Sequence, residues 1–283
     1  RPMFLIGAMA AFIGCLIIAS AIIYKVFFLF IIGSMLLGFS QANQQFYRYA
    51  AADNVTTKLK SKAISLVLAG GLIAAIVGPE VSRYSFDFFP DYVYLATYLC
   101  AAFIQILNFV ILTFVKIKKP KPIINSIRPL SEILMRKTVI IAILAAAVGY
   151  SLMSFIMTAT PLQIVNVCKL GDSASATVIQ WHVIAMFAPS FFTGSIINLI
   201  GNRKVMMLGV TLYVLSISFG VIGQTIQHFW VSLFLCGLGW NFLYVGGSDI
   251  IAKAALPEER AKVQGVTDFI IFIFVASGSF LAG

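Results

Sequence analysis

Nine apolar runs, each long enough to cross a lipid bilayer as a helix, divide this chain of 283 residues. They lie near 3–24, 26–48, 62–83, 92–115, 138–160, 174–200, 204–223, 228–252 and 263–283. A transmembrane helix needs about 20 consecutive, mostly apolar residues. Hydrophobic residues make up 60% of the chain and charged residues 11%, which is unlike a soluble protein of this length. We therefore predict an all-α integral membrane protein with about nine transmembrane helices, the last of them cut at the chain end.

The net charge of +10 is explained by membrane topology. If Arg1 lies in the cytoplasm, 17 of the 20 lysine and arginine residues fall in cytoplasmic segments, and only Lys25, Arg83 and Lys169 fall outside. Cytoplasmic loops of membrane proteins carry such a basic excess. We therefore place residue 1 and the segment 116–137 in the cytoplasm, and we expect membrane lipids rather than nucleic acid as partners.

Two short internal matches indicate a duplication. Residues 1–7 align with 203–209, and residues 60–65 align with 260–265, at nearly the same offset and in both cases at a helix boundary. We predict four helices in 1–115, a cytoplasmic linker at 116–137 and five helices in 138–283. Because the chain begins inside the repeated segment and without an initiator Met, we expect a fragment of a longer protein that does not transport by itself.

A short polar hinge joins the runs 174–200 and 204–223. Gly194 and Gly201 permit a tight turn, Asn198 can accept hydrogen bonds, and Arg203 and Lys204 face water or anionic headgroups. Elsewhere, Gly78-Pro79 allows its helix to bend, which serves either packing or gating.

Polar groups lie at the ends of two apolar runs that correspond to each other in the internal repeat, at an offset of about 201 residues. Gln41 and Gln44 end one run, and Trp240 and Asn241 lie in the other. Amides in hydrocarbon are costly unless they are paired, so they face either a cavity or the cytoplasmic interface. Arg48 and Asp249 lie at equivalent cytoplasmic ends, where they either form an ion pair or reach separately to the interface.

Other candidates lie in the second half. Tyr150, Met153 and Met157 share a helical spacing that suits either a pocket wall or packing. Gln180, Trp181 and His182 follow, and His182 is either a titrating group or a packed, hydrogen-bonded residue. Asp268 either pairs with Arg260 or Lys262 at a gate or has a structural capping role.

The hinge Gly194-x-x-x-Asn198-x-x-Gly201-x-Arg203-Lys204 resembles the signature loop of the major facilitator superfamily (MFS) of secondary transporters. That loop usually has Asp where Asn198 stands, which removes a charge from the position. Residues 69–79 look like the family's glycine-proline signature of the fifth helix, and residues 257–265 resemble its loop before the eleventh. The resemblance implies a two-half helical bundle with inverted repeats, of which this chain covers helices three to eleven of twelve.

This resemblance implies a monomeric transporter that moves a small organic solute by alternating access and needs no cofactor. Residues 47–53, 157–161 and 180–194 look like a bacterial branch of the family, some members of which are thought to carry vitamins such as riboflavin; this implies the bacterial inner membrane. For the substrate path we name Gln41, Gln44, Tyr150, Met153, Met157, Gln180, Trp181, His182, Trp240 and Asn241. For the gate and hinge we name Arg48, Asp53, Gly78, Pro79, Gly194, Asn198, Gly201, Arg203, Lys204, Asp249, Arg260 and Asp268.

Aromatic faces with amide donors suit a flat, neutral heteroaromatic solute. Symport with protons is one option, and an exporter of the same superfamily or a transport-inactive receptor or scaffold are the alternatives. An embedded enzyme would need clustered His, Asp, Glu or Cys, but neither His182 nor His228 has a carboxylate three or four residues later. The four cysteines have no metal-like spacing, so we predict neither an enzyme nor a metal site.

Overall fold

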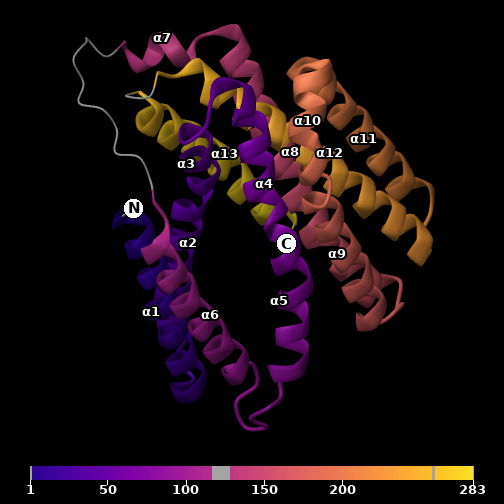
Figure 1. The fold of residues 1–283 in the computed structure, drawn as a ribbon. Coiled ribbons are helices and arrows are strands. Elements are labelled where there is room, and N and C mark those ends of the chain that lie inside the picture. The colour runs from indigo at the N-terminus through magenta and orange to yellow at the C-terminus, as the bar shows by residue number, and fades with distance from the viewer. Residues whose placement is uncertain (1, 117–127, 257–258, 283) are drawn as a thin grey trace. The chain divides into compact units, whose positions relative to one another are not determined.

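The computed structural model describes residues 2–116, 128–256 and 259–282, and within these residues all regular structure is helical. The elements are α1 (Pro2–Tyr24), α2 (Phe27–Gln45), α3 (Tyr47–Asp53), η1 (Thr57–Leu59), α4 (Lys60–Ala69), α5 (Gly71–Ser85), α6 (Leu95–Phe114), α7 (Leu130–Leu134), α8 (Lys137–Leu162), η2 (Gln163–Val167), α9 (Asp172–Phe187), α10 (Ser190–Ile200), α11 (Asn202–Ile222), α12 (Ile226–Ala254) and α13 (Arg260–Ala282). Figure 1 shows them along the chain.

The predicted membrane helices are present. In the described residues, eight helices are long and apolar enough to cross a bilayer, and α9 with α10 forms a ninth, broken span. The run 174–200 is therefore not one straight helix, because α9 and α10 meet at a bend of 41°. Pro189 stands at this bend; a proline removes a helical hydrogen bond and clashes with the preceding turn.

Packing divides the chain into two compact units, Arg1–Ala50 with Ile76–Lys118, and Ala51–Ala75 with Lys119–Gly283. In the first unit, α1 packs against both α2 and α6. The buried face of α1 carries small residues such as Gly7, Ala11 and Gly14. Small residues let helix backbones approach closely, which drives helix association in lipid.

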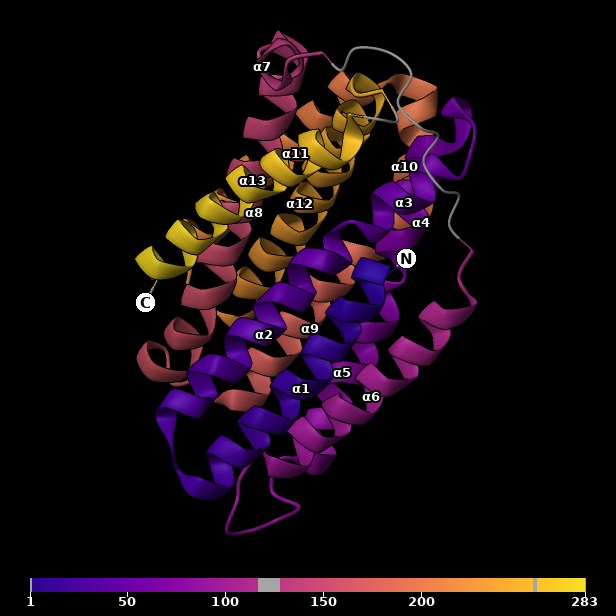
Figure 2. The ribbon, with the colours of Figure 1, turned by 90° about the vertical axis from the view of Figure 1, so that its left-hand side faces the viewer.

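The second unit is organised around α12. This helix packs against α8, α9 and α11, while α13 packs along α8; Figure 2 shows α8 and α13 side by side. The helix α4 belongs to this unit because it packs against α10 and α12. The division into halves at 116–137 concerns the internal repeat and stays a prediction, and residues 117–127 of the linker lie outside the described residues.

Candidate substrate path and cytoplasmic gate

An aromatic cluster lies in the second unit where α8, α9, α12 and α13 meet. Trp240 stacks on Tyr244 with ring centroids 4.8 Å apart, and Tyr150 meets both rings edge-on at 5.4 Å. Phe187 and Phe272 add contacts of 5.8 Å to Trp240 and Tyr150. These five residues, which we call the aromatic cluster, pack their rings against one another, so a heteroaromatic solute would bind here by replacing one of these ring contacts.

Trp240 carries an unused hydrogen-bond donor inside this cluster. Its side chain is 2% exposed, and within the described residues its indole Nε1 has no hydrogen-bond partner. A buried donor without an acceptor costs free energy. An acceptor brought into the cluster by a ligand would remove that cost.

Asn241, the next residue, uses its amide to hold helices together. Its Oδ1 accepts from Thr193 Oγ1 at 2.7 Å, and its Nδ2 donates to the Met186 carbonyl and to Ser190 Oγ, both at 2.6 Å. The side chain is fully buried. Asn241 therefore joins α12 to the bend between α9 and α10, since its three partners lie on both sides of Pro189.

His182 is packed and hydrogen-bonded, which is one of the two roles that the sequence left open for it. It is completely buried, and its Nδ1 lies 2.6 Å from the Leu233 carbonyl. A carbonyl accepts only, so Nδ1 must carry the proton. The other nitrogen, Nε2, is buried without a partner in the described part of the chain.

A polar network joins the ends of α4, α11 and α12 that the distribution of basic residues predicts to be cytoplasmic. Asp249 of α12 is fully buried, and Ser61 of α4 donates to its Oδ1 at 2.7 Å. Its Oδ2 accepts from Asn202 Nδ2 at 2.7 Å and from Lys253 Nζ at 2.6 Å. A buried carboxylate costs free energy unless charged or polar donors bond to it, and here both oxygens of Asp249 have such donors.

The hinge completes this network from α10. Asn198 Nδ2 donates to the Lys58 carbonyl at 3.2 Å, and its Oδ1 lies 3.3 Å from the Ser61 hydroxyl. Gly194 allows α4 and α10 to touch, because a Cβ there would lie 2.5 Å from the Ser61 carbonyl oxygen. Gly201 ends α10 with a φ of +87°, which side chains disfavour. Ser61, Asn198, Asn202, Asp249 and Lys253 are called the cytoplasmic gate below.

Two further ion pairs lie at the same ends of the helices. Arg260 at the start of α13 pairs with Asp53 at the end of α3. Arg128 donates from Nε and Nη2 to the two carboxylate oxygens of Glu259, which also accepts from the Leu256 N–H. The bonds from Arg128 lower the pKa of Glu259 to about 2, and the same bonds raise the pKa of Arg128.

The remaining candidates of the second unit lie in varied settings. Met153 is buried and Met157 packs beside it, both against the aromatic cluster. Trp181 is 42% exposed and meets Trp230 edge-on at 5.8 Å, outside the cluster, and Gln180 is half-buried in α9. Arg203 and Lys204 are exposed at the start of α11. Asp268 is buried in α13.

Candidates of the first unit are less concentrated. Gln41 is exposed on α2, and Gln44 donates to Ser40 one turn earlier at 3.3 Å. Arg48 is buried in α3, where it bonds Gln45 and Tyr49. Gly78 and Pro79 lie exposed within α5. The proposed pair of Arg48 with Asp249 stays a prediction, and each of the two has other partners in its own unit.

Sequence reasoning missed several members of these sites. Tyr244 and Lys253 lie four residues after Trp240 and Asp249, and this spacing puts side chains together on a helix, so a signal existed. Ser190 and Thr193 lie one turn apart after Pro189 and carried a weaker signal. Ser61 carried none, because its bond to Asp249 joins residues 188 positions apart in sequence.

No protein-family model matches the chain. The riboflavin transporter RfnT of Brucella anthropi is 39% identical to it over 287 residues, covering 100% of the chain and 72% of that protein. Two Bacillus subtilis proteins described as uncharacterized MFS-type transporters, YdeG and YddS, are 28% and 27% identical over 99% of the chain and cover 68% and 67% of their own lengths.

Among solved structures, the chain is similar to a bacterial homologue of the iron transporter ferroportin in an outward-facing state. The TM-score is 0.67, and the match covers 99% of this chain and 74% of that one. The sequence identity is 12%, so this likeness concerns the fold alone.

Proposed function

Because the chain belongs to the major facilitator superfamily of membrane transporters, we propose that it carries a flat, neutral heteroaromatic solute, with riboflavin as the first candidate. The relative named a riboflavin transporter, 39% identical along the whole chain, supports the choice of solute. The aromatic cluster supports it independently, since it offers stacking faces rather than charges.

The aromatic cluster with its unused indole donor is the observation that carries the proposal. A tricyclic heteroaromatic ring has two flat faces and carbonyl and ring-nitrogen acceptors at its edge. When the cluster opens, the ring of Tyr150 or Trp240 would stack on one face of the solute, and Trp240 Nε1–H would donate to an edge acceptor. Asn241, whose amide is fully used within the protein, would position Trp240 rather than contact the solute.

The cytoplasmic gate provides the second part of the proposal. Ser61 belongs to the predicted N-terminal part of the chain, and Asp249, Asn198 and Asn202 belong to the C-terminal half. Breaking these bonds would free α4 from α10 and α12, as alternating access requires of contacts between two halves. The resting network would therefore keep the cytoplasmic side closed.

Proton coupling and location complete the proposal. We place the protein in the bacterial inner membrane as a monomer, with its basic segments in the cytoplasm. His182 is completely buried and bonded to the Leu233 carbonyl, so we assign it a packing role and propose no proton carrier among the described residues. We propose that a proton gradient drives uptake of the solute; export of the solute is the alternative.

Riboflavin binding to the purified full-length protein tests the solute assignment. It is measured as the loss of flavin fluorescence on binding. The variant Trp240→Phe keeps a stacking ring and loses the donor. Since one hydrogen bond contributes about 0.5–1.5 kcal/mol, its dissociation constant should rise by up to about tenfold.

Trp181→Phe is the matched control, because Trp181 lies outside the aromatic cluster beside Trp230. It should bind as the unmodified protein does. Absence of riboflavin binding by the folded protein, or equal losses in the two tryptophan variants, would contradict the assignment.

A further inference from the structure

Tyr213 of α11 packs on α12 and bonds the backbone of α8. Its side chain is 4% exposed, and its hydroxyl donates to the Gly149 carbonyl at 2.5 Å. A carbonyl oxygen has two lone pairs, so that of Gly149 can accept this bond beside the helical one from the N–H four residues later. Tyr213 thereby fixes α8 at the residue that directly precedes Tyr150 of the aromatic cluster.

The ring of Tyr213 lies against α12 at Gly239, the residue that directly precedes Trp240. A Cβ atom on Gly239 would lie 2.9 Å from Cδ2 of the Tyr213 ring and 3.0 Å from the Gly209 carbonyl oxygen. Any side chain at Gly239 would therefore displace the ring. Because both glycines lack a side chain, α11 and α12 approach closely here, and Tyr213 fits against the backbone.

We propose that Tyr213 is a positioning residue that sets the spacing between the rings of Tyr150 and Trp240. It contacts the residue before each ring, through its hydroxyl on α8 and through its own ring on α12. The two cluster rings meet edge-on with centroids 5.4 Å apart. A site that is held in place before binding loses less freedom on binding, and its affinity is higher for that reason.

Because the proposed function has the solute replace a ring contact of the aromatic cluster, the effect of Tyr213 on solute affinity rests on that function. The spacing of the rings is a property of the protein without solute. The two effects are therefore measured separately, the first with riboflavin and the second without it.

The test variant is Tyr213→Phe in the full-length protein, which removes the hydroxyl and keeps the ring beside Gly239. Fluorine NMR of protein labelled with fluorotryptophan reports on Trp240, whose signal is identified by its loss in Trp240→Phe. The Trp240 signal should shift and broaden in Tyr213→Phe, because the bond to α8 no longer fixes the neighbouring Tyr150 ring. The dissociation constant of riboflavin should rise by about two- to tenfold, the effect of one hydrogen bond.

Ser216→Ala is the matched control on the same helix. Ser216 lies one turn after Tyr213, is fully buried, and donates from its hydroxyl to the Ser232 carbonyl of α12 at 2.7 Å. The variant loses the same kind of bond between helices, but about two turns of α12 away from Trp240. It should leave the Trp240 signal and the riboflavin affinity unchanged.

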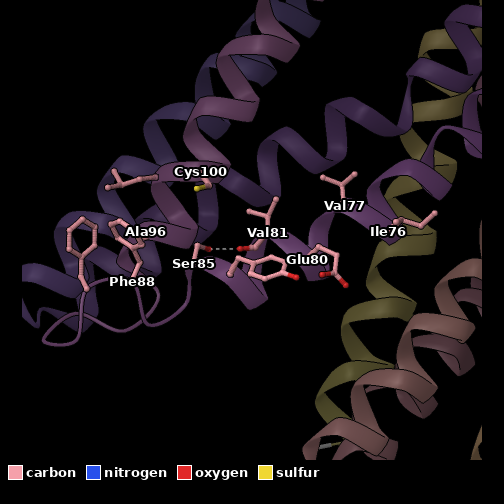
Figure 3. A pocket seen from close by; sticks show the side chains of 11 residues that line it. Ile76, Val77, Glu80, Val81, Ser85, Phe88, Ala96 and Cys100 are labelled. Atoms are coloured by element: carbon pink, nitrogen blue, oxygen red, sulfur yellow. Dashed lines mark hydrogen bonds between the residues drawn. The ribbon is translucent and has the colours of Figure 1, made fainter.

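Ser85→Ala is a second control, in the first unit. The Ser85 hydroxyl donates to the Val81 carbonyl on the wall of an apolar cleft, as Figure 3 shows, and it also bonds Thr97. Its loss removes a buried hydroxyl that has no contact with the aromatic cluster among the described residues. This variant should also leave both measurements unchanged.

An unchanged Trp240 signal in Tyr213→Phe, or equal changes in Tyr213→Phe and Ser216→Ala, would overturn the positioning role. An unchanged riboflavin affinity in Tyr213→Phe would overturn it as well, and the solute assignment would stand, because the unmodified protein binds riboflavin in that case. If the unmodified protein does not bind riboflavin and the Trp240 signal shifts in Tyr213→Phe alone, the solute assignment fails and the role of Tyr213 in ring spacing is supported.

Discussion

Neighbouring residues on α12 have opposite roles because one uses its polar atoms and the other does not. Asn241 satisfies three groups at the bend between α9 and α10, while the Trp240 indole N–H next to it faces no acceptor in the described part of the chain. A satisfied buried amide fixes structure, whereas an unsatisfied donor marks a place where a ligand gains binding energy.

Replacing Asn241 by alanine should destabilise the protein. The change removes three buried hydrogen bonds and leaves the Met186 carbonyl and the Ser190 hydroxyl without this partner. We expect a loss of about 2–3 kcal/mol in the free energy of unfolding, measured by denaturant titration in detergent. Gln41→Ala, at an exposed position, is the control; an Asn241→Ala protein as stable as that control would refute the structural role.

At the scale of helices, the cytoplasmic gate should respond to loss of its central carboxylate. Asp249→Asn keeps the shape but removes the charge that Lys253 and Ser61 bond to. Freed from this contact, α4 should separate more often from α12. We expect a cysteine in place of Ser65, which is buried one turn after Ser61, to react about tenfold faster with a cytoplasmic maleimide.

The control for this gate experiment is Asp91→Asn, which removes an exposed carboxylate outside the network. It should leave the labelling rate of the Ser65→Cys reporter unchanged. If the reporter reacts at the same rate with and without the Asp249→Asn change, the network does not hold the helices closed.

The ion pair between Arg128 and Glu259 joins the segment before α7 to the start of α13, and its strength should depend on pH. Bonds from Arg128 lower the pKa of Glu259 from 4.5 to about 2. A lowered native pKa stabilises the fold above the unfolded pKa, and this stabilisation is lost as the pH falls from about 4.5 through 2. The thermal midpoint of the unmodified protein should therefore exceed that of Arg128→Gln at pH 7, and the difference should shrink toward pH 2.

Between pH 6 and 8 the same difference should stay constant, because Glu259 remains ionised throughout. A difference that changes in this range, or that is equally large at about pH 2, would contradict this account of the pair.

For the whole molecule, hydropathy predicted the membrane helices well because a helix in lipid must be apolar along its length. It did not predict the bend at Pro189, since composition is unchanged across it. The stacking of Trp240 on Tyr244 follows from helical spacing, but the bond of Ser61 to Asp249 depends on how distant helices pack.

Riboflavin uptake by vesicles containing the full-length protein, with and without an imposed proton gradient, tests the proposed transport function directly. We expect saturable uptake that the gradient drives to accumulation, that Trp240→Ala abolishes and that Trp181→Phe preserves. Saturable flux that ignores the gradient would remove proton coupling and keep the solute assignment. No riboflavin flux in either direction from a correctly folded protein would contradict the assignment of riboflavin as the transported solute.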